Sequence, residues 1–345
     1  MQLDIHAIKT ITLGALRTEE KDGFFTFSRF SEKQEAFLLE NGRAPKLYSA
    51  SSIRLEFYTK GGEVSFDYEI SPGTAREYYS IDLLVDQVYR CHVSKETCTD
   101  SGSFRYWIPS GGEQRVTIYF PSTAVIRIRN VNVPDDYAPH RRKRKILALG
   151  DSSMQGYHPN HFQNTYANLL ADFYDAEMLN QAIGGDCFCA ANLDELAFCP
   201  DFIIVSYGTN DWVIGCFRKG EEAEKYFKRL TELYPKLPIF AELPADIDYL
   251  TKMRRNDDVL PVSSCVQNAD DENFAKQQTL QDVRNLLSEI IKKHQNITAI
   301  DTKNFIPQYE ECFYADHVHL TDLGNVLFGN ALIREISKYY PGKKA

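Results

Sequence analysis

The first 140 or so residues alternate between hydrophobic and polar positions in short runs, which is the pattern of half-buried β-strands. Residues 53–57 alternate, Gly61 and Gly62 follow, and residues 64–70 alternate again, so the pattern predicts a β-hairpin here. Short strands separated by Gly, Pro and Ser turns at roughly ten-residue spacing predict an all-β sandwich with a jelly-roll-like arrangement. Further alternating runs lie at residues 81–85, 104–108, 116–120 and 125–128.

After residue 140 the pattern changes to nearly continuous hydrophobic runs that alternate with helical stretches, as at residues 221–234 and 280–294. Such runs are typical of strands buried on both faces of a sheet. Repeated strand–helix–strand units predict an α/β fold with a parallel, doubly wound sheet, in which ligands bind outside the carboxyl ends of the strands. The predicted strands lie at residues 146–149, 178–179, 202–205, 239–241 and 297–300.

The change of pattern divides the chain into two predicted domains, residues 1–140 and residues 141–345. Two domains also agree with a length of 345 residues. The boundary falls in the stretch 134–139, which is followed by the basic run 140–145. Because that run directly precedes a buried strand, we interpret it as a solvated linker rather than as a nucleic-acid site.

Composition and charge narrow the range of partners. The 48 acidic residues outnumber the 39 Lys and Arg residues, and a formal net charge of −9 argues against nucleic acid or an anionic membrane. With no long apolar run and no secretory signal, the chain is predicted to be soluble and cytoplasmic. We expect its eight cysteines to stay reduced, and we expect no cofactor and no metal. The oligomeric state stays open, with a homodimer as one alternative.

Candidate catalytic side chains lie in two parts of the chain: one follows the first predicted strand of the parallel sheet, and the others lie near the C-terminus. Ser152 comes just after residues 146–149, where a serine can act as a nucleophile if a base takes its proton. His319 is the candidate base, and Asp316 can hold its other ring nitrogen. Taken alone, Ser152 is better explained as a turn or helix-capping residue. His317 is an alternative base, although it is too near Asp316 in sequence for an orienting hydrogen bond.

Two further motifs offer hydrogen-bond donors to the oxyanion that forms when a serine attacks an acyl carbon. Gly185 follows the second strand and can present a backbone N–H with no side chain in the way. Asn210, in the sequence Gly-Thr-Asn-Asp after the third strand, can present a side-chain N–H. Each motif alone is compatible with an ordinary turn, but together they predict one site at one edge of the sheet, with the chemistry of a serine ester hydrolase.

Residues 146–340 resemble the SGNH (GDSL-type) hydrolase superfamily in the order and spacing of the motifs around Ser152, Gly185, Asn210 and His319. The resemblance implies a flavodoxin-like, three-layer α/β/α fold. It also implies that Ser152, His319 and Asp316 form a catalytic triad. The implied oxyanion hole consists of the backbone N–H groups of Ser152 and Gly185 and the side chain of Asn210.

A β-rich domain before such a hydrolase is similar to the two-domain carbohydrate esterases of family two, which implies removal of acetyl groups from sugar hydroxyls. Tyr207 and Trp212 can form an aromatic wall for a sugar, or can equally pack in the core. Asp211, between Asn210 and Trp212, is a third candidate for substrate contact. The long polar segment 244–276 is predicted to be a substrate-contacting lid.

We therefore predict a serine ester hydrolase that removes short acyl groups, acetyl in the first place, from O-acylated carbohydrates through an acyl-enzyme. The alternatives among enzymes are a lysophospholipase, a thioesterase, a general short-chain esterase, and a transacylase that passes the acyl group to a sugar. A carbohydrate-binding protein without catalysis is the alternative from another class. The complete set of candidate catalytic residues argues against it.

Overall fold

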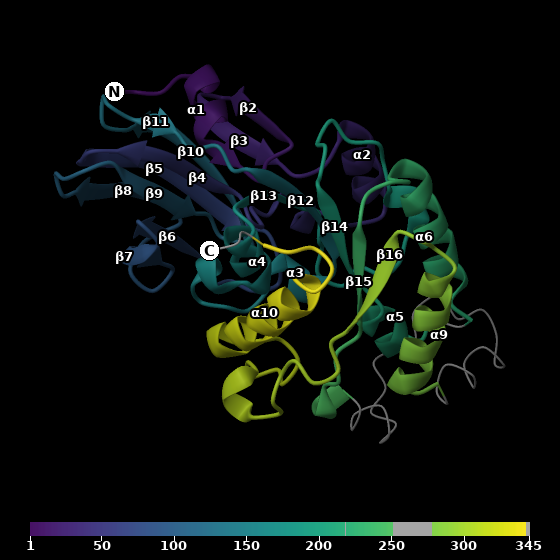
Figure 1. The fold of residues 1–345 in the computed structure, drawn as a ribbon. Helices are drawn as coiled ribbons and strands as arrows, with labels where there is room; N and C mark the ends of the chain where they lie inside the picture. The colour runs from purple at the N-terminus through teal and green to yellow at the C-terminus, as the bar shows by residue number, and fades with distance from the viewer. Residues whose placement is uncertain (218, 251–277, 343–345) are drawn as a thin grey trace.

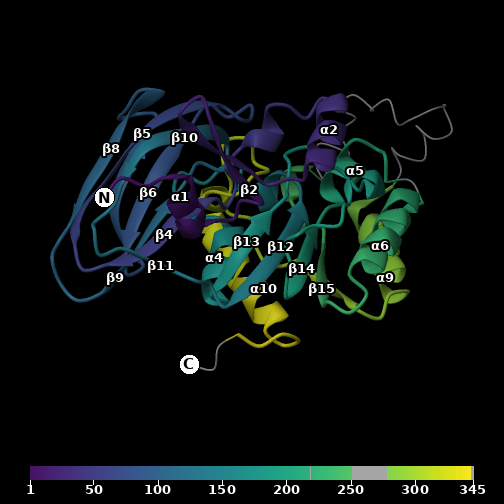
Figure 2. The same ribbon diagram turned by 90° about the horizontal axis from the view of Figure 1, so that it is seen from above.

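The computed structural model describes residues 1–217, 219–250 and 278–342. Its strands form three sheets, two antiparallel and one parallel. Figures 1 and 2 show the antiparallel sheets beside the parallel one, with helices on both faces of the latter. The predicted α/β fold is confirmed. No helix in these ranges has the length and apolar character that crossing a bilayer requires.

The N-terminal strands form two antiparallel sheets whose buried side chains share one hydrophobic core. The order is β1-β4-β9-β6-β7, with β11 on β4, in one sheet and β2-β3-β10-β5-β8 in the other. A jelly-roll connectivity stays a prediction. The strands are β1 (Thr12–Leu13), β2 (Arg17–Lys21), β3 (Phe24–Ser28), β4 (Arg54–Thr59), β5 (Gly62–Pro72), β6 (Ser80–Val85), β7 (Val88–Ser94), β8 (Ser101–Ile108), β9 (Gln114–Tyr119), β10 (Ala124–Asn132) and β11 (Ala138–Pro139).

The predicted hairpin across Gly61 and Gly62 is wrong, because β4 and β5 belong to different sheets. β4 pairs with β1, β9 and β11, whereas β5 pairs with β8 and β10. Gly61 has a φ of 129°, and a side chain there would collide with the backbone of Ser110. The glycines therefore let the chain cross between facing sheets, so that Phe57 and Phe66 both enter the shared core.

The N-terminal region also contains helices that the all-β prediction missed. They are α1 (Ile5–Ile11), α2 (Glu32–Glu40) and the short 3-10 helix η1 (Lys46–Tyr48). The N-terminus of α2 carries a capping box, in which Ser31 and Gln34 satisfy each other's backbone N–H groups. The hydrophobic pattern of this nine-residue helix is only weakly amphipathic, so a search for periodicity does not reveal it. The capping residues at its start are the signal that marks it as a helix.

The parallel sheet has the strand order β13-β12-β14-β15-β16. This is the flavodoxin-like order 2-1-3-4-5 that the superfamily resemblance implied. All five strands predicted from the hydrophobic runs are confirmed. They are β12 (Arg144–Gly150), β13 (Ala176–Asn180), β14 (Phe202–Ser206), β15 (Ile239–Leu243) and β16 (Ile297–Asp301).

Helices cover both faces of the parallel sheet, which confirms the three layers. Alternate strand residues such as Leu147 and Val205 pack against α6 and α9, and their neighbours such as Ile146 and Ile204 pack against α4 and α10. Two short helices, α3 and α5, begin directly after strands β12 and β14. The helices are α3 (Ser152–Gln155), α4 (Tyr166–Phe173), α5 (Thr209–Val213), α6 (Glu221–Leu233), α9 (Leu280–Lys292) and α10 (Asp322–Ile336), with the 3-10 helices η2 (Phe162–Asn164), η3 (Ala190–Asn192) and η4 (Glu310–Cys312).

The basic run 140–145 is only in part the solvated linker that we inferred from the sequence: Arg141, Lys143 and Lys145 are exposed, whereas His140 and the side chain of Arg142 are buried. The side chain of Arg142 is only 1% exposed, and its Nη2 lies 2.7 Å from Glu56 and 2.8 Å from Asp172. Glu56 belongs to β4 and Asp172 to α4. Buried carboxylates on both sides therefore draw this segment into the interface between the antiparallel sheets and the α/β region.

Candidate active site

Ser152 begins the short helix α3 immediately after β12. Asp151 caps this helix, and its Oδ1 accepts a hydrogen bond from the backbone N–H of Ser153 at 3.0 Å. Gly150 is required before it, since a side chain there would lie 2.9 Å from the carbonyl oxygen of Ser206. The sharp turn from strand to helix places the Ser152 hydroxyl at the carboxyl edge of the sheet.

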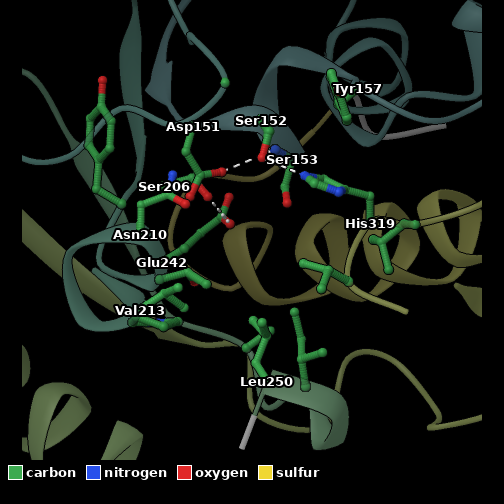
Figure 3. Close-up of a pocket in the computed structure, with 18 of the residues that line it drawn as sticks. Asp151, Ser152, Ser153, Tyr157, Ser206, Asn210, Val213, Glu242, Leu250 and His319 are labelled. Carbon is green, nitrogen blue, oxygen red and sulfur yellow. Dashed lines mark hydrogen bonds between the residues drawn. The ribbon is translucent and has the colours of Figure 1, made fainter. Parts of the chain in front are cut away.

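His319 and Asp316 reach Ser152 from the loop that precedes α10. The Ser152 Oγ lies 2.7 Å from His319 Nε2, and His319 Nδ1 lies 2.7 Å from Asp316 Oδ2. The other Asp316 oxygen accepts hydrogen bonds from the backbone N–H groups of Val318 and His319, each at 3.0 Å. Figure 3 shows the side chains of Ser152 and His319 pointing toward each other in the wall of a cavity. The structure therefore brings together the three residues that the sequence nominated.

A second histidine, His158, also contacts Asp316. Its Nε2 lies 2.9 Å from Asp316 Oδ2, and its ring stacks on Tyr314 with the centroids 4.3 Å apart. Partial burial raises the pKa of Asp316, but hydrogen bonds from His158, His319 and the backbone outweigh it and hold this pKa well below its usual range. Burial lowers the pKa of His158, so His158 is neutral at neutral pH and donates from Nε2. Asp316 is thus ionised and fixed in orientation.

The segment that carries Gly185 is positioned by a buried arginine from the antiparallel region. Arg29 is fully buried and donates to the carbonyl oxygens of Asn180 and Ala182. Gly185 has a φ of 85°, a conformation that favours glycine, and its backbone N–H makes no hydrogen bond to the described residues. Asn210, at the start of α5, donates one side-chain N–H to the carbonyl oxygen of Asp186 at 3.0 Å. Its second N–H is left for a ligand.

A cavity of about 420 Å³ adjoins Ser152 and His319. The antiparallel region contributes to its wall through Lys46, whose Nζ donates to the carbonyl oxygen of Gly184 at 2.7 Å. Tyr157 packs against the ring of His319, with the centroids 4.8 Å apart. Much of the remaining wall is apolar, including Val213, Leu243, Ile247, Leu250, Ile306, Val318, Leu320 and Phe328. The site can therefore hold an organic group much larger than water beside the serine.

The three residues predicted to contact the substrate do not all lie at the cavity. Tyr207 lies in the cavity wall. Trp212 is 2% exposed and donates its Nε1–H to the carbonyl oxygen of Gln278. Asp211 is also buried and accepts a hydrogen bond from the backbone N–H of Phe188. Neither Asp211 nor Trp212 is among the described residues that line the cavity, because α5 turns both inward. Trp212 therefore takes the alternative of core packing.

The structure also separates the alternative base and the predicted lid from the triad. His317 has a φ of 57° and its ring packs on Tyr249, so it is His319 that faces Ser152. Of the predicted lid 244–276, the part before residue 251 contributes Pro244, Ile247 and Leu250 to the cavity wall. Residues 251–276 of that prediction lie outside the described residues.

The cavity and triad contacts that sequence reasoning missed include Lys46, His158 and Glu242. Lys46 begins the short 3-10 helix η1 and His158 lies in a loop, and neither belongs to a motif, so no local signal marks them. Glu242 could have been found, because a charged residue near the end of an otherwise apolar strand points to the functional edge of the sheet.

Among the described residues, two groups of side chains offer metal-ligand atoms within 4.8 Å of one another: His158, Asp316 and His319, and Cys187, Asp211 and Cys216. The first uses the same nitrogen and oxygen atoms that hold the triad together. No disulfide joins the cysteines within residues 1–217, 219–250 and 278–342.

We predict that the protein loses stability as the pH rises from about 5 to 8.5. Burial raises the pKa of Glu242 to about 8, of Asp211 to about 7, and of Asp151 and Asp186 to about 6. Carboxyl groups whose pKa is raised by folding stabilise the protein below their unfolded pKa, and that stability is lost as the pH rises through the folded pKa. Chemical denaturation at pH 5 and at pH 8.5 should show a loss of at least about 4 kcal/mol, because Glu242 alone keeps its proton in the folded protein for about three pH units above pH 5.

The variant Glu242→Gln should flatten that pH dependence, because an amide does not titrate. The variant Glu222→Gln, at an exposed position of α6, should leave it unchanged. Stability that rises steadily over the same range would contradict the prediction.

Comparison with known proteins places the chain among ester-hydrolysing relatives. The model of the GDSL-like lipase/acylhydrolase family matches residues 148–327, more than half of the chain. No curated protein matches the chain in sequence.

Solved structures share the fold over nearly the whole chain. The salicylyl-acyltransferase SsfX3 from a tetracycline biosynthetic pathway is 17% identical, with a TM-score of 0.74 and 96% of each chain covered. An acetyl xylan esterase from the rumen bacterium Butyrivibrio proteoclasticus is 12% identical, with a TM-score of 0.60 and 98% of each chain covered. A family two carbohydrate esterase from Cellvibrio japonicus is 14% identical, with a TM-score of 0.58, and covers 95% of this chain and 94% of that one.

Proposed function

Because the chain belongs to the GDSL-like lipase/acylhydrolase family, we propose that it is a serine esterase that works through an acyl-enzyme on Ser152. The observation that carries the proposal is the unbroken line of contacts from Ser152 Oγ to His319 and on to Asp316, each 2.7 Å long. Such a line lets the histidine take the serine proton while the aspartate stabilises the imidazolium that forms.

The first half of the reaction forms the acyl-enzyme. Ser152 Oγ attacks the acyl carbon of the ester, and its proton passes to His319 Nε2. His319 then gives this proton to the oxygen of the departing alcohol, so the alcohol must lie on the His319 side of the cavity. Asp316 stays ionised throughout, since His158 and two backbone N–H groups also donate to it.

The second half releases the acid. A water molecule takes the place of the alcohol, His319 accepts one of its protons, and the water oxygen attacks the acyl carbon on Ser152. The bond between that carbon and Ser152 Oγ then breaks, and His319 returns the proton to Ser152 Oγ, which frees the acid and restores the enzyme. The negative charge that develops in both halves falls on the former carbonyl oxygen. We propose that the N–H groups of Ser152 and Gly185 and the side chain of Asn210 stabilise it there.

The variant Asn210→Ala should lower kcat about 100-fold to 1000-fold with a small change in KM, because the lost hydrogen bond is strongest in the transition state. Steady-state kinetics on 4-nitrophenyl acetate measures both constants. Asn285→Ala, at an exposed position of α9, is the matched control and should be unaffected. An Asn210→Ala enzyme with a wild-type kcat would remove Asn210 from the oxyanion hole.

For the substrate, we propose a short acyl group on a carbohydrate hydroxyl, with acetyl as the smallest candidate. Support comes from the shared fold of the family two carbohydrate esterase and the acetyl xylan esterase named above. The mixed wall of the cavity, with Lys46 and Tyr157 beside the triad, suits a polar alcohol better than a long lipid chain.

We also propose that the boundary between the two domains lies at residue 140.

Acetate release from a panel of acetylated xylo-, manno- and amino-sugar oligosaccharides tests the carbohydrate proposal. Esters of one alcohol with acyl chains of increasing length separate it from a lysophospholipase, a thioesterase or a general esterase, since a pocket that fits a short acyl group loses activity steeply once the chain outgrows it. Good turnover of long-chain esters, with none of the sugar panel, would overturn it.

Acyl transfer is a second candidate reaction. The observation that favours it is the fold similarity to an enzyme named as an acyltransferase, at a TM-score of 0.74 over 96% of both chains. In a transferase, a second alcohol takes the place of water at His319. Product analysis in the presence of excess sugar acceptor decides between the two reactions, because only transfer yields a new ester.

A further inference from the structure

A buried glutamate lines the same cavity as Ser152 and takes no part in the triad. Glu242 lies on β15, is 5% exposed, and belongs to the cavity wall. β14 lies between β15 and β12, the strand that leads to Ser152. At a strand spacing of about 4.8 Å, Glu242 is roughly 10 Å across the sheet from the start of the nucleophile turn. It is therefore placed to meet a substrate atom a few bonds from the acyl carbon.

One oxygen of this carboxyl group is satisfied and the other is not. Tyr166 donates its hydroxyl hydrogen to Ser206 Oγ at 3.3 Å, and Ser206 Oγ donates to Glu242 Oε2 at 2.9 Å. Glu242 Oε1 is buried and has no hydrogen-bond partner among the described residues. Tyr166 and Ser206 also line the cavity. A buried polar atom without a partner is costly to the protein. Because Glu242 belongs to the cavity wall, a rotation of its carboxyl group can bring this oxygen to a ligand in the cavity.

The ligand group that meets Glu242 belongs to the acyl part of the substrate. The departing alcohol must lie beside His319, because His319 protonates it in the proposed mechanism. Figure 3 shows His319 on one side of the cavity, with Ser206 and Glu242 on the other. An acetyl group has only three non-hydrogen atoms and leaves most of a cavity of about 420 Å³ unfilled. A longer acyl group can extend from Ser152 to Glu242.

A hydroxyl group is the chemical complement of Glu242 Oε1. Since Oε2 accepts from Ser206, a protonated carboxyl presents its O–H at Oε1, and an ionised one presents an acceptor there. A hydroxyl can accept in the first case and donate in the second. A purely hydrocarbon acyl chain can do neither and would leave Oε1 desolvated without a partner. The apolar neighbours Leu243, Ile306 and Phe328 suit the carbon skeleton of such an acyl group.

We propose that the preferred acyl group carries a hydroxyl substituent and that Glu242 is the residue that recognises it. The proposal rests on the proposed esterase function and specifies the acid half of its substrate. Glu242 acts in specificity, by hydrogen bonding to the acyl chain, while the triad performs the reaction.

Matched ethyl esters test the proposal, since in each pair a methyl group replaces the hydroxyl at nearly constant shape. The pairs are lactate with isobutyrate, 3-hydroxybutyrate with isovalerate, and 4-hydroxypentanoate with 4-methylpentanoate. We expect kcat/KM for the wild-type protein, measured by acid release, to favour the hydroxylated member of at least one pair about 10-fold or more. A ratio near or below one in every pair would overturn the proposal.

Variants then assign the preference to Glu242. Glu242→Leu should abolish the ratio in the favoured pair, whereas Glu242→Gln, which keeps a hydrogen-bonding group, should retain much of it. Glu222→Leu, at an exposed position of α6, is the matched control and should keep the wild-type ratio. A Glu242→Leu enzyme with the full wild-type ratio would overturn the assignment. If Glu242→Leu does not fold, the proposal is decided by the ratio of kcat/KM values measured for the wild-type protein and for Glu242→Gln.

The same panel separates this proposal from the underlying one. If neither member of any pair nor 4-nitrophenyl acetate is hydrolysed, the esterase function itself fails. If the methyl members are hydrolysed as fast as the hydroxylated ones, the esterase function stands and only the hydroxyl specificity fails.

Discussion

Replacing Ser152 with alanine is expected to reduce kcat for an activated ester such as 4-nitrophenyl acetate on the order of 10⁵-fold to 10⁶-fold. The alanine has no oxygen to attack the acyl carbon, and His319 Nε2, 2.7 Å from the lost hydroxyl, then has no proton to accept. Because the components of a triad act as a unit, removing the nucleophile forfeits the contribution of all three. The steady-state rate of 4-nitrophenol release, after subtraction of the rate without enzyme, measures the residual activity.

Two neighbouring variants control for structural damage. Ser153→Ala removes a hydroxyl one position further along α3, and His317→Ala removes the histidine that faces Tyr249 instead of Ser152. Both should keep kcat within a few-fold of the wild type, and all three variants should unfold at the wild-type temperature. Substantial turnover by a correctly folded Ser152→Ala enzyme would exclude Ser152 as the nucleophile.

Much of the α/β region and the triad geometry could be predicted because the information is local. Each parallel strand is a short apolar run, and Ser152, Gly185 and Asn210 follow successive strands, so the topology alone brings them to one edge. His319 and Asp316 are only three residues apart in one loop. The contact between Ser152 and His319 joins residues far apart in the chain, and it was expected from the resemblance to the SGNH superfamily.

The N-terminal region was harder, because its pairing depends on distant parts of the chain. β4 and β5 are adjacent in sequence but join different sheets, and periodicity is the same for a strand in either sheet. The α2 helix depends on a capping box that interrupts the strand-like pattern. The buried state of Arg142 depends on carboxylates at Glu56 and Asp172, far from it in sequence.

The cavity wall was only partly predictable for a related reason. Trp212 and Asp211 are beside Asn210 in sequence, yet a helical turn sends their side chains in other directions. Conversely, Lys46 reaches the site from the antiparallel region, and Arg29 holds the segment before Gly185 from the same side. The antiparallel region therefore helps to build the site as well as packing against it.

The interface between the two regions contains a buried ion cluster. Glu56 on β4 is fully buried, with its carboxylate 2.7 Å from Arg142, 3.3 Å from Arg54 and 3.7 Å from Arg115. Asp172 on α4 shares Arg142 and Arg54. Burying charged groups costs desolvation energy, which such a cluster offsets only while the charges remain paired.

We therefore predict that Glu56→Gln lowers the free energy of unfolding by about 3–5 kcal/mol, because it leaves buried guanidinium groups with too little negative charge. The replacement keeps the size and shape of the side chain, so the loss measures charge rather than packing. Denaturant unfolding of the whole chain, followed by fluorescence, gives the difference. Glu63→Gln is the matched control, since Glu63 pairs with Arg105 at 3.6 Å on the surface and its loss should cost less than about 1 kcal/mol. Equal stability of the two variants would mean that the charge of Glu56 contributes no more than that of a surface pair, and would overturn the prediction.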